Sequence, residues 1–87
     1  MNIVVIYPGR FQPFHKGHHA VYNYLVGKFG RSNVWVATSN KTDQVKSPFN
    51  FAEKSYFMQL TGVPSNAIIE VDQPYKIETV VATGRIN

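Results

Sequence analysis

Residues 3–18 decide how this chain folds, and they read Ile3-Val4-Val5-Ile6-Tyr7-Pro8-Gly9-Arg10-Phe11-Gln12-Pro13-Phe14-His15-Lys16-Gly17-His18. The first five are apolar and mostly β-branched, which is typical of a strand buried on both faces in a parallel sheet. A turn follows with two glycines, two prolines and basic side chains but no carboxylate, and a helix is predicted over 17–29. Because a helix N-terminus attracts anions, this strand-to-helix turn predicts a phosphate site.

Further along the chain, strand and helix patterns alternate. Strands are predicted at 34–38 and 67–71, and a short third helix ends near Gly84. The second helix starts either near Ser47-Pro48 or after a cap at Asn50 with Glu53 as its partner. Each longer helix has four apolar residues at helical spacing that we expect on one face. They are Val21, Tyr24, Leu25 and Phe29 in the first helix, and Phe49, Ala52, Tyr56 and Leu60 in the second.

The order βαβαβα predicts an α/β fold. We expect a Rossmann-like three-layer α/β/α arrangement with a parallel sheet, right-handed crossovers and the strand order 3-2-1. In this order the first strand is an edge, and its apolar backbone would be uncovered. We therefore expect residues 1–87 to be the N-terminal half of a larger fold, or a domain that another chain completes. A homo-oligomer or a partner protein could cover the edge.

Charge and composition narrow the functional classes. The net charge is +4, with five basic residues and no acidic residue before Asp43, and four basic and five acidic residues from Asp43 onward. The positive N-terminal half favours a phosphate-bearing ligand or a nucleic acid. The absence of cysteine excludes disulfides and thiolate metal sites. With no apolar run of about 18 residues, we expect no membrane span and a cytoplasmic protein.

The turn offers what a nucleoside triphosphate needs. Its glycines would let backbone N–H groups approach phosphate oxygens, and its arginine and lysine would supply charge. His15 and His18 lie three residues apart, so they share a helix face and can donate hydrogen bonds to one polyphosphate. A metal cluster of these two with His19 is an alternative, although no cysteine or acidic ligand lies nearby. Without Walker A, G-x-G-x-x-G or G-x-S-x-G motifs, a P-loop NTPase, a dinucleotide dehydrogenase and a serine hydrolase are disfavoured.

The segment from Gly9 to His18 resembles the signature of the nucleotidyltransferase superfamily with its H-x-G-H motif. The fuller G-R-F-Q-P-x-H-x-G-H form is similar to nicotinamide-mononucleotide adenylyltransferases of the archaeal type and their bacterial and phage relatives. Ser47-Pro48-Phe49 with Glu53-Lys54 resembles that family's P-F-x-x-x-E-R segment, with lysine in place of arginine. The resemblance covers about residues 3–62. Since these relatives include phage proteins, it is compatible with a phage-encoded protein in the cytoplasm of its host.

The resemblance implies an enzyme that joins a nucleoside triphosphate, most simply ATP, to a phosphate-bearing acceptor such as nicotinamide mononucleotide, and releases pyrophosphate. The acceptor's phosphate oxygen would attack the α-phosphorus, and this anion needs no general base. His15 and His18 would bind the triphosphate and stabilise the transition state, while Mg²⁺ would arrive with the nucleotide, and we assign it no protein ligand. The residues that contact the nucleotide and its phosphates would be Gly9, Arg10, Phe11, Lys16 and Gly17 of the turn, and Lys46. The residues bordering the acceptor would be Thr38, Ser39, Asn40 and Lys41.

One element of the superfamily is missing from the chain. The late serine-containing loop that closes on the phosphates has no counterpart, since Thr83-Gly84-Arg85-Ile86-Asn87 does not match it. Alternatives that share the turn are a cytidylyltransferase and a phosphopantetheine adenylyltransferase. A truncated, non-catalytic module that binds a nucleotide or a protein belongs to another class. Nucleic-acid binding through the basic half is the weakest alternative, because no RNA-binding motif accompanies it.

Overall fold

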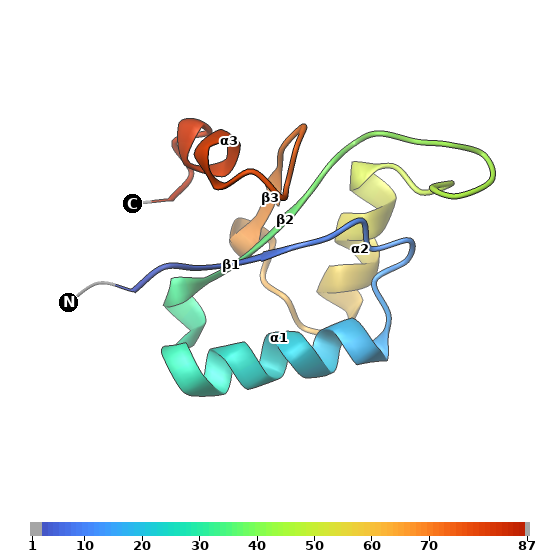
Figure 1. The fold of residues 1–87 in the computed structure, drawn as a ribbon. Helices are drawn as coiled ribbons and strands as arrows, with labels where there is room; N and C mark the ends of the chain where they lie inside the picture. Colours follow the sequence, from blue (N-terminus) through green and yellow to red (C-terminus); the bar gives the residue numbers. More distant parts are fainter. Residues whose placement is uncertain (1–2, 87) are drawn as a thin grey trace.

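The computed structural model describes residues 3–86, which form one parallel three-stranded sheet with helices on both faces (Figure 1). The strands are β1 (Val5–Pro8), β2 (Val34–Thr38) and β3 (Ile68–Glu70). The α-helices are α1 (Lys16–Phe29), α2 (Phe51–Leu60) and α3 (Ile77–Ala82). Short 3-10 turns, η1 (Arg31–Asn33) and η2 (Ser65–Ala67), precede β2 and β3. The predicted order of elements is confirmed, and β2 has the predicted bounds.

β2 is the central strand of the sheet. It pairs in parallel with β1, where Val34 aligns with Val5, and with β3, where Val36 aligns with Ile68. The resulting order β1-β2-β3 confirms the predicted 3-2-1 arrangement, in which β1 is an edge. Over the described residues β1 pairs with β2 alone, and Ile3 just before it is 45% exposed. What covers this edge stays a prediction.

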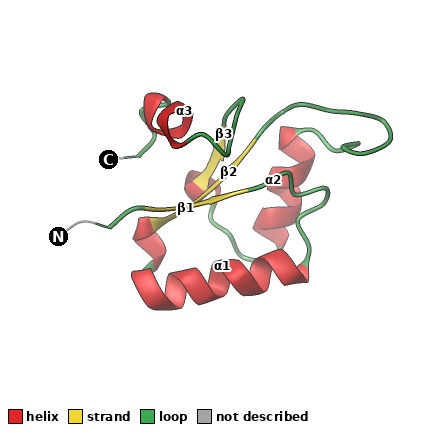
Figure 2. Ribbon diagram, in the orientation of Figure 1, coloured by secondary structure: helices red, strands yellow, loops and turns green. Residues whose placement is uncertain are grey.

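Two hydrophobic clusters, one on each face, hold the layers together. Val36 of β2 packs with Tyr22 of α1 and Met58 of α2. Ala37, the next residue of β2, packs with Val80 of α3 on the opposite face. Because successive strand side chains point to opposite faces, α1 and α2 cover one side of the sheet and α3 covers the other (Figure 2). This confirms the three-layer prediction.

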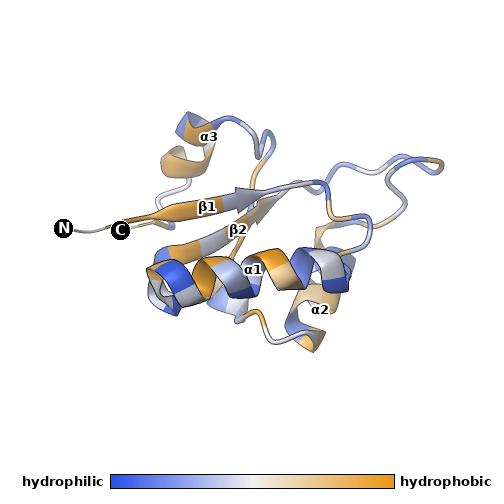
Figure 3. Cartoon of the chain, turned by 60° about the horizontal axis from the view of Figure 1, so that its bottom comes forward, coloured by the Kyte–Doolittle hydropathy of each residue, from blue (hydrophilic) through white to orange (hydrophobic). Residues whose placement is uncertain are grey.

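The packed face of α1 differs from the predicted one. Tyr22 is buried, and Leu25 and Phe29 pack beside it, whereas Val21 and Tyr24 are 44% and 64% exposed. Figure 3, in which the ribbon is coloured by hydropathy, shows hydrophobic and polar residues mixed along α1. A stripe that starts at Tyr22 has the same helical spacing as one that starts at Val21, so periodicity alone does not choose between them.

α2 begins with a capping box. Asn50 Oδ1 accepts the backbone N–H of Glu53 at 2.9 Å, and the Glu53 carboxylate accepts the N–H of Asn50 at 3.1 Å. The side chain of Asn40 also accepts the N–H of Phe51 at 2.8 Å. The helix therefore starts after Asn50 and not near Ser47-Pro48.

The buried side of α2 also contradicts the predicted face. Tyr56 and Leu60 are 61% and 66% exposed, while Lys54 and Met58 are buried. Lys54 was left out of the apolar pattern because it is charged, yet it lies on the side that faces the sheet. This one side chain brings a positive charge to the end of β2, where the candidate site lies.

Candidate nucleotide site

The predicted turn leaves the sheet at the carboxyl end of β1, beside the end of β2, which is where parallel α/β sheets bind ligands. The N–H of Gly9 donates to the carbonyl of Ala37 at 3.1 Å. Phe11 has a left-handed φ of 49° and turns its ring inward, where it is 3% exposed. A Cβ on Gly9 would lie 2.6 Å from that ring. Glycine at this position therefore makes room for Phe11.

His15 caps α1 with its own side chain. His15 Nδ1 accepts the N–H of Gly17 at 3.0 Å, and His18 Nδ1 accepts the N–H of His15 at 3.2 Å. The two imidazole rings stack, with centroids 3.9 Å apart and planes 24° from parallel. A Cβ on Gly17 would lie 2.9 Å from Cε1 of His15. The glycine of the H-x-G-H motif therefore leaves space for the first histidine ring.

These hydrogen bonds determine which ring nitrogen of each histidine is left to donate to a ligand. Since Nδ1 of both His15 and His18 accepts a backbone N–H, a neutral ring must hold its proton on Nε2. Burial and the neighbouring His15 lower the pKa of His18, which favours the neutral form. Both histidines line one cavity. The cavity can therefore receive two Nε2–H donors even when neither ring carries an additional proton.

The structure adds a second reason for the two glycines. They were predicted to let backbone N–H groups approach phosphate oxygens, and their own N–H groups are engaged within the protein, since Gly9 donates to Ala37 and Gly17 donates to His15. What the site uses is the absence of a Cβ, which lets an aromatic ring pack closely at each position. The glycines shape the site through Phe11 and His15.

The loop between β2 and α2 is attached to the same turn. Gln12 donates from Nε2 to the carbonyl of Phe49 and accepts the N–H of Phe49 at Oε1, each at 2.8 Å. Arg10 donates to the carbonyl of Lys46 at 3.2 Å and to the hydroxyl of Ser47. These contacts join segments 36 to 37 residues apart in the sequence. They hold the loop over the carboxyl end of the sheet.

Two cavities adjoin at this turn. The first, of about 430 Å³, contains the histidine pair, and the second, of about 520 Å³, lies beneath the β2–α2 loop. Arg10, Gln12 and Tyr75 line both. The basic residues around the two cavities are Arg10, Lys41, Lys46, Lys54 and Lys76. This arrangement suits two phosphate-bearing ligands that meet near Arg10.

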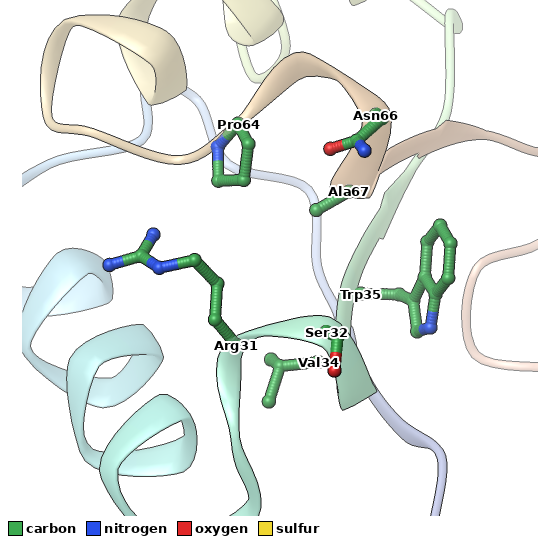
Figure 4. Close-up of a pocket in the computed structure, with 7 residues that line it drawn as sticks. All are labelled: Arg31, Ser32, Val34, Trp35, Pro64, Asn66 and Ala67. Carbon is green, nitrogen blue, oxygen red and sulfur yellow. The ribbon is translucent and has the colours of Figure 1, made fainter.

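A third cavity, of about 580 Å³, lies at the other end of the strands (Figure 4). Arg31 and Trp35 line it, together with Pro64 and Ala67 near η2. Trp35 also packs against the cluster on the α3 face. None of the predicted site residues lines this cavity.

The predicted site residues divide into two groups. Those that line the first cavity are Gly9, Arg10, Phe11, His15, His18 and Lys46, and those that line the second are Ser39 and Lys41. Lys16 and Gly17 line neither. Thr38 is fully buried, and the side chain of Asn40 accepts the N–H of Phe51 at the start of α2. Both residues therefore support the second cavity without lining it. The predicted site residues therefore gather around the turn, but the sequence did not separate lining residues from supporting ones.

Two participants were missed by the sequence-based prediction. Gln12 was not assigned any role, although it connects the turn to Phe49. Lys54 was noted only as a replacement for arginine, although it lines the second cavity. The available signal was its spacing, since Lys54 lies four residues before the buried Met58.

The polar side chains around the first cavity carry imidazole, guanidinium and ammonium nitrogens, the amide of Gln12 and the hydroxyls of two tyrosines, and no carboxylate. Mg²⁺ prefers carboxylate, phosphate and water oxygens, so these residues do not suit it as direct ligands. Across residues 3–86 we find no group of three histidine, cysteine or acidic side chains arranged to hold a metal ion. Nor is any helix there long and apolar enough to cross a bilayer.

A parallel α/β sheet with a basic cavity at the carboxyl ends of its strands has the arrangement in which open α/β proteins bind their ligands. The family model described as cytidylyltransferase-like matches residues 6–83. The chain belongs to this family. The predicted membership of the nucleotidyltransferase superfamily is therefore confirmed.

Named relatives agree with this assignment. Nicotinamide-nucleotide adenylyltransferases of Sulfurisphaera tokodaii and Saccharolobus solfataricus are each 37% identical over 49 residues, which is 56% of this chain and 28% of each relative. The enzyme of the same name from Methanosarcina acetivorans is 33% identical over 48 residues, or 55% of this chain and 28% of that protein. The match spans less than a third of these relatives. No solved structure gave a significant match.

Proposed function

We propose that this chain binds the reacting phosphates of a nucleotidyltransferase that transfers AMP from ATP to nicotinamide mononucleotide and releases pyrophosphate. The observation that carries the proposal is the stacked histidine pair, whose Nδ1 atoms are both occupied by backbone N–H groups. The names of the relatives support the choice of nucleotide and acceptor.

The residues of the site suit this transfer. ATP would place its triphosphate against the Nε2–H donors of His15 and His18, with Lys46 on the same side. An oxygen of the acceptor's phosphate forms a bond to the α-phosphorus, and the bond from that phosphorus to the bridging oxygen of the β-phosphate breaks. The departing pyrophosphate takes the electron pair, so charge grows where the imidazole donors point. Mg²⁺, carried by the ATP phosphates, would supply further neutralisation of charge.

Pyrophosphate release from ATP, measured with and without nicotinamide mononucleotide, tests the proposal. We expect release only when both substrates are present. His18→Ala should lower the rate by about a hundredfold or more, because a positioned donor to the transition state is lost. His19→Ala is the matched control, since this neighbouring histidine hydrogen-bonds Asn23 and lines neither cavity. Equal rates for the two variants would contradict the proposal.

A second candidate is a cytidylyltransferase, which the description of the family favours. The same assay with CTP and choline phosphate or a sugar phosphate tests this candidate, and phosphopantetheine with ATP tests a third acceptor. Saturable ATP binding by calorimetry without any pyrophosphate release would instead identify a nucleotide-binding module.

A further inference from the structure

The second cavity has a buried positive charge at its base. Lys54 is 1% exposed, and its ammonium group donates to the hydroxyl of Thr38 at 2.9 Å. The Thr38 hydroxyl in turn donates to the carbonyl of Arg10 at 3.4 Å. Because an ammonium can only donate, the hydroxyl must accept from Lys54 and keep its own proton for Arg10. The chain of contacts aligns Lys54 with the turn that binds phosphate.

This charge lacks compensation in the described part of the chain. The bond to Thr38 is the one hydrogen bond that its ammonium makes there, so two of its three N–H donors remain for a ligand. Burial lowers the pKa of Lys54, and the positive charge of Arg10 lowers it further. A buried ammonium without an ion-pair partner is costly unless an anion accompanies it.

The other charged groups around Lys54 do not remove the need for an anion. Those lining its cavity are Arg10, Lys41, Asp43, Asp72 and Lys76, so cations outnumber carboxylates. Oδ1 of Asp43 accepts the N–H groups of Val45 and Lys46, which orients this carboxylate toward its own loop.

We propose that Lys54 binds the phosphate group of the acceptor substrate, with Thr38 as the positioning residue that directs its ammonium. The inference rests on the proposed transferase function and extends it to a residue outside the predicted site. Lys54 lines the second cavity and not the one that contains the histidines. Arg10 and Gln12 line both cavities, so a phosphate on Lys54 would lie beside the α-phosphate, as in-line attack requires.

The first experiment compares nicotinamide mononucleotide with nicotinamide riboside, which lacks the phosphate. Wild-type protein should prefer the phosphorylated compound, and Lys54→Met should weaken its binding by about tenfold to a hundredfold, because a hydrogen bond to a charged group is lost. Binding of the riboside and of ATP should change little. Lys54→Arg should recover most of the affinity, since guanidinium also binds phosphate. Lys28→Met, which removes one exposed charge far from the site, is the matched control.

A second readout does not depend on the acceptor's identity or on activity. Nitrogen NMR of the lysine ammonium groups should show a saturable shift of the Lys54 signal on addition of inorganic phosphate, larger than that of Lys28. Thr38→Val, which keeps the ammonium but removes its anchor, should weaken that response. This measurement on the wild type also decides the matter if Lys54→Met does not fold.

The outcomes separate the two proposals. A phosphate response at Lys54 without pyrophosphate release would contradict the transferase function and support the anion site. Pyrophosphate release with an unchanged KM for the acceptor in Lys54→Met would overturn the role of Lys54 and leave the function standing. A Lys54 signal that responds to phosphate no more than Lys28 would also overturn it.

Discussion

Replacing Gly17 by alanine should separate the stability of the fold from the function of the site. Residue 17 lies in the first turn of α1, beneath the ring of His15. The added Cβ would lie 2.9 Å from Cε1 and 3.1 Å from Nδ1 of that ring, which is closer than a real Cβ comes to other atoms. The imidazole must swing away, and both its bond to the N–H of Gly17 and its stack on His18 are lost.

The two effects on stability nearly cancel. Alanine is favoured over glycine inside a helix by up to about 1 kcal/mol, and less in the first turn. Loss of the cap costs about 1 kcal/mol. The melting temperature should therefore change by only a few degrees, given about 4–8 °C per kcal/mol for a chain of this size. The displaced ring no longer aims Nε2 into the cavity, so ATP affinity should fall by about tenfold to a hundredfold.

Gly27→Ala is the control on the same helix. No atom lies within 4 Å of the Cβ that it would add, so alanine should stabilise the protein by up to about 1 kcal/mol and leave ATP binding unchanged. Thermal melts monitored by circular dichroism and ATP titrations by calorimetry measure both properties. If Gly17→Ala binds ATP as well as Gly27→Ala does, the histidine cap does not orient the site and the reasoning is wrong.

Three further variants test the same structure. Burial and the neighbouring His15 lower the pKa of His18 from 6.5, so the unfolded chain binds the His18 proton more tightly than the folded chain does. The stability that His18 contributes is therefore complete above about pH 6.5 and is lost as the pH falls toward the lowered pKa. Melts between about pH 5 and pH 8 should show this slope, and His18→Gln should flatten it while His19→Gln does not. Lys54→Met should raise the melting temperature, because an apolar side chain replaces a buried charge and Thr38 keeps its bond to Arg10. A marked loss of stability in this variant would show that the charge supports the fold. Asn50→Ala should cost about 1 kcal/mol by removing the capping box of α2, and Asn50→Ser should retain most of that energy; equal melting temperatures for the two variants would contradict the role of the cap.

Local signals made much of the fold predictable. The apolar run of β2 has no competing pattern, and its predicted bounds are those observed. The Asn50–Glu53 pair offered the observed start of α2 as one of two alternatives, because a capping box depends only on residues three apart, and the structure decides in its favour. The alternation of strands and helices predicts a parallel sheet, and the 3-2-1 order followed from the order that a mononucleotide-binding half of a doubly wound fold adopts.

The helix faces show where local information ends. The stripe through Val21 and the stripe through Tyr22 satisfy the same helical period, and the side that α1 turns to the sheet decides which is buried. For α2 the apolar pattern selected Tyr56 and Leu60, and the structure buries Lys54 instead. Only packing against Thr38 and the turn gives a reason to bury an ammonium there.

The turn from Pro8 to His18 contains both kinds of information. Its residue types and spacing predict a phosphate site, and they were sufficient to pair His15 with His18, because a three-residue separation places two side chains on one helix face. The roles within it depended on contacts between distant segments and on close approach of rings. Gly9 N–H is taken up by Ala37 of the neighbouring strand, and Gly17 is required by the ring that caps the helix. Sequence spacing therefore specified which groups could act, and the packed structure decided which atoms are free to do so, since a hydrogen bond already made within the protein is not available to a ligand.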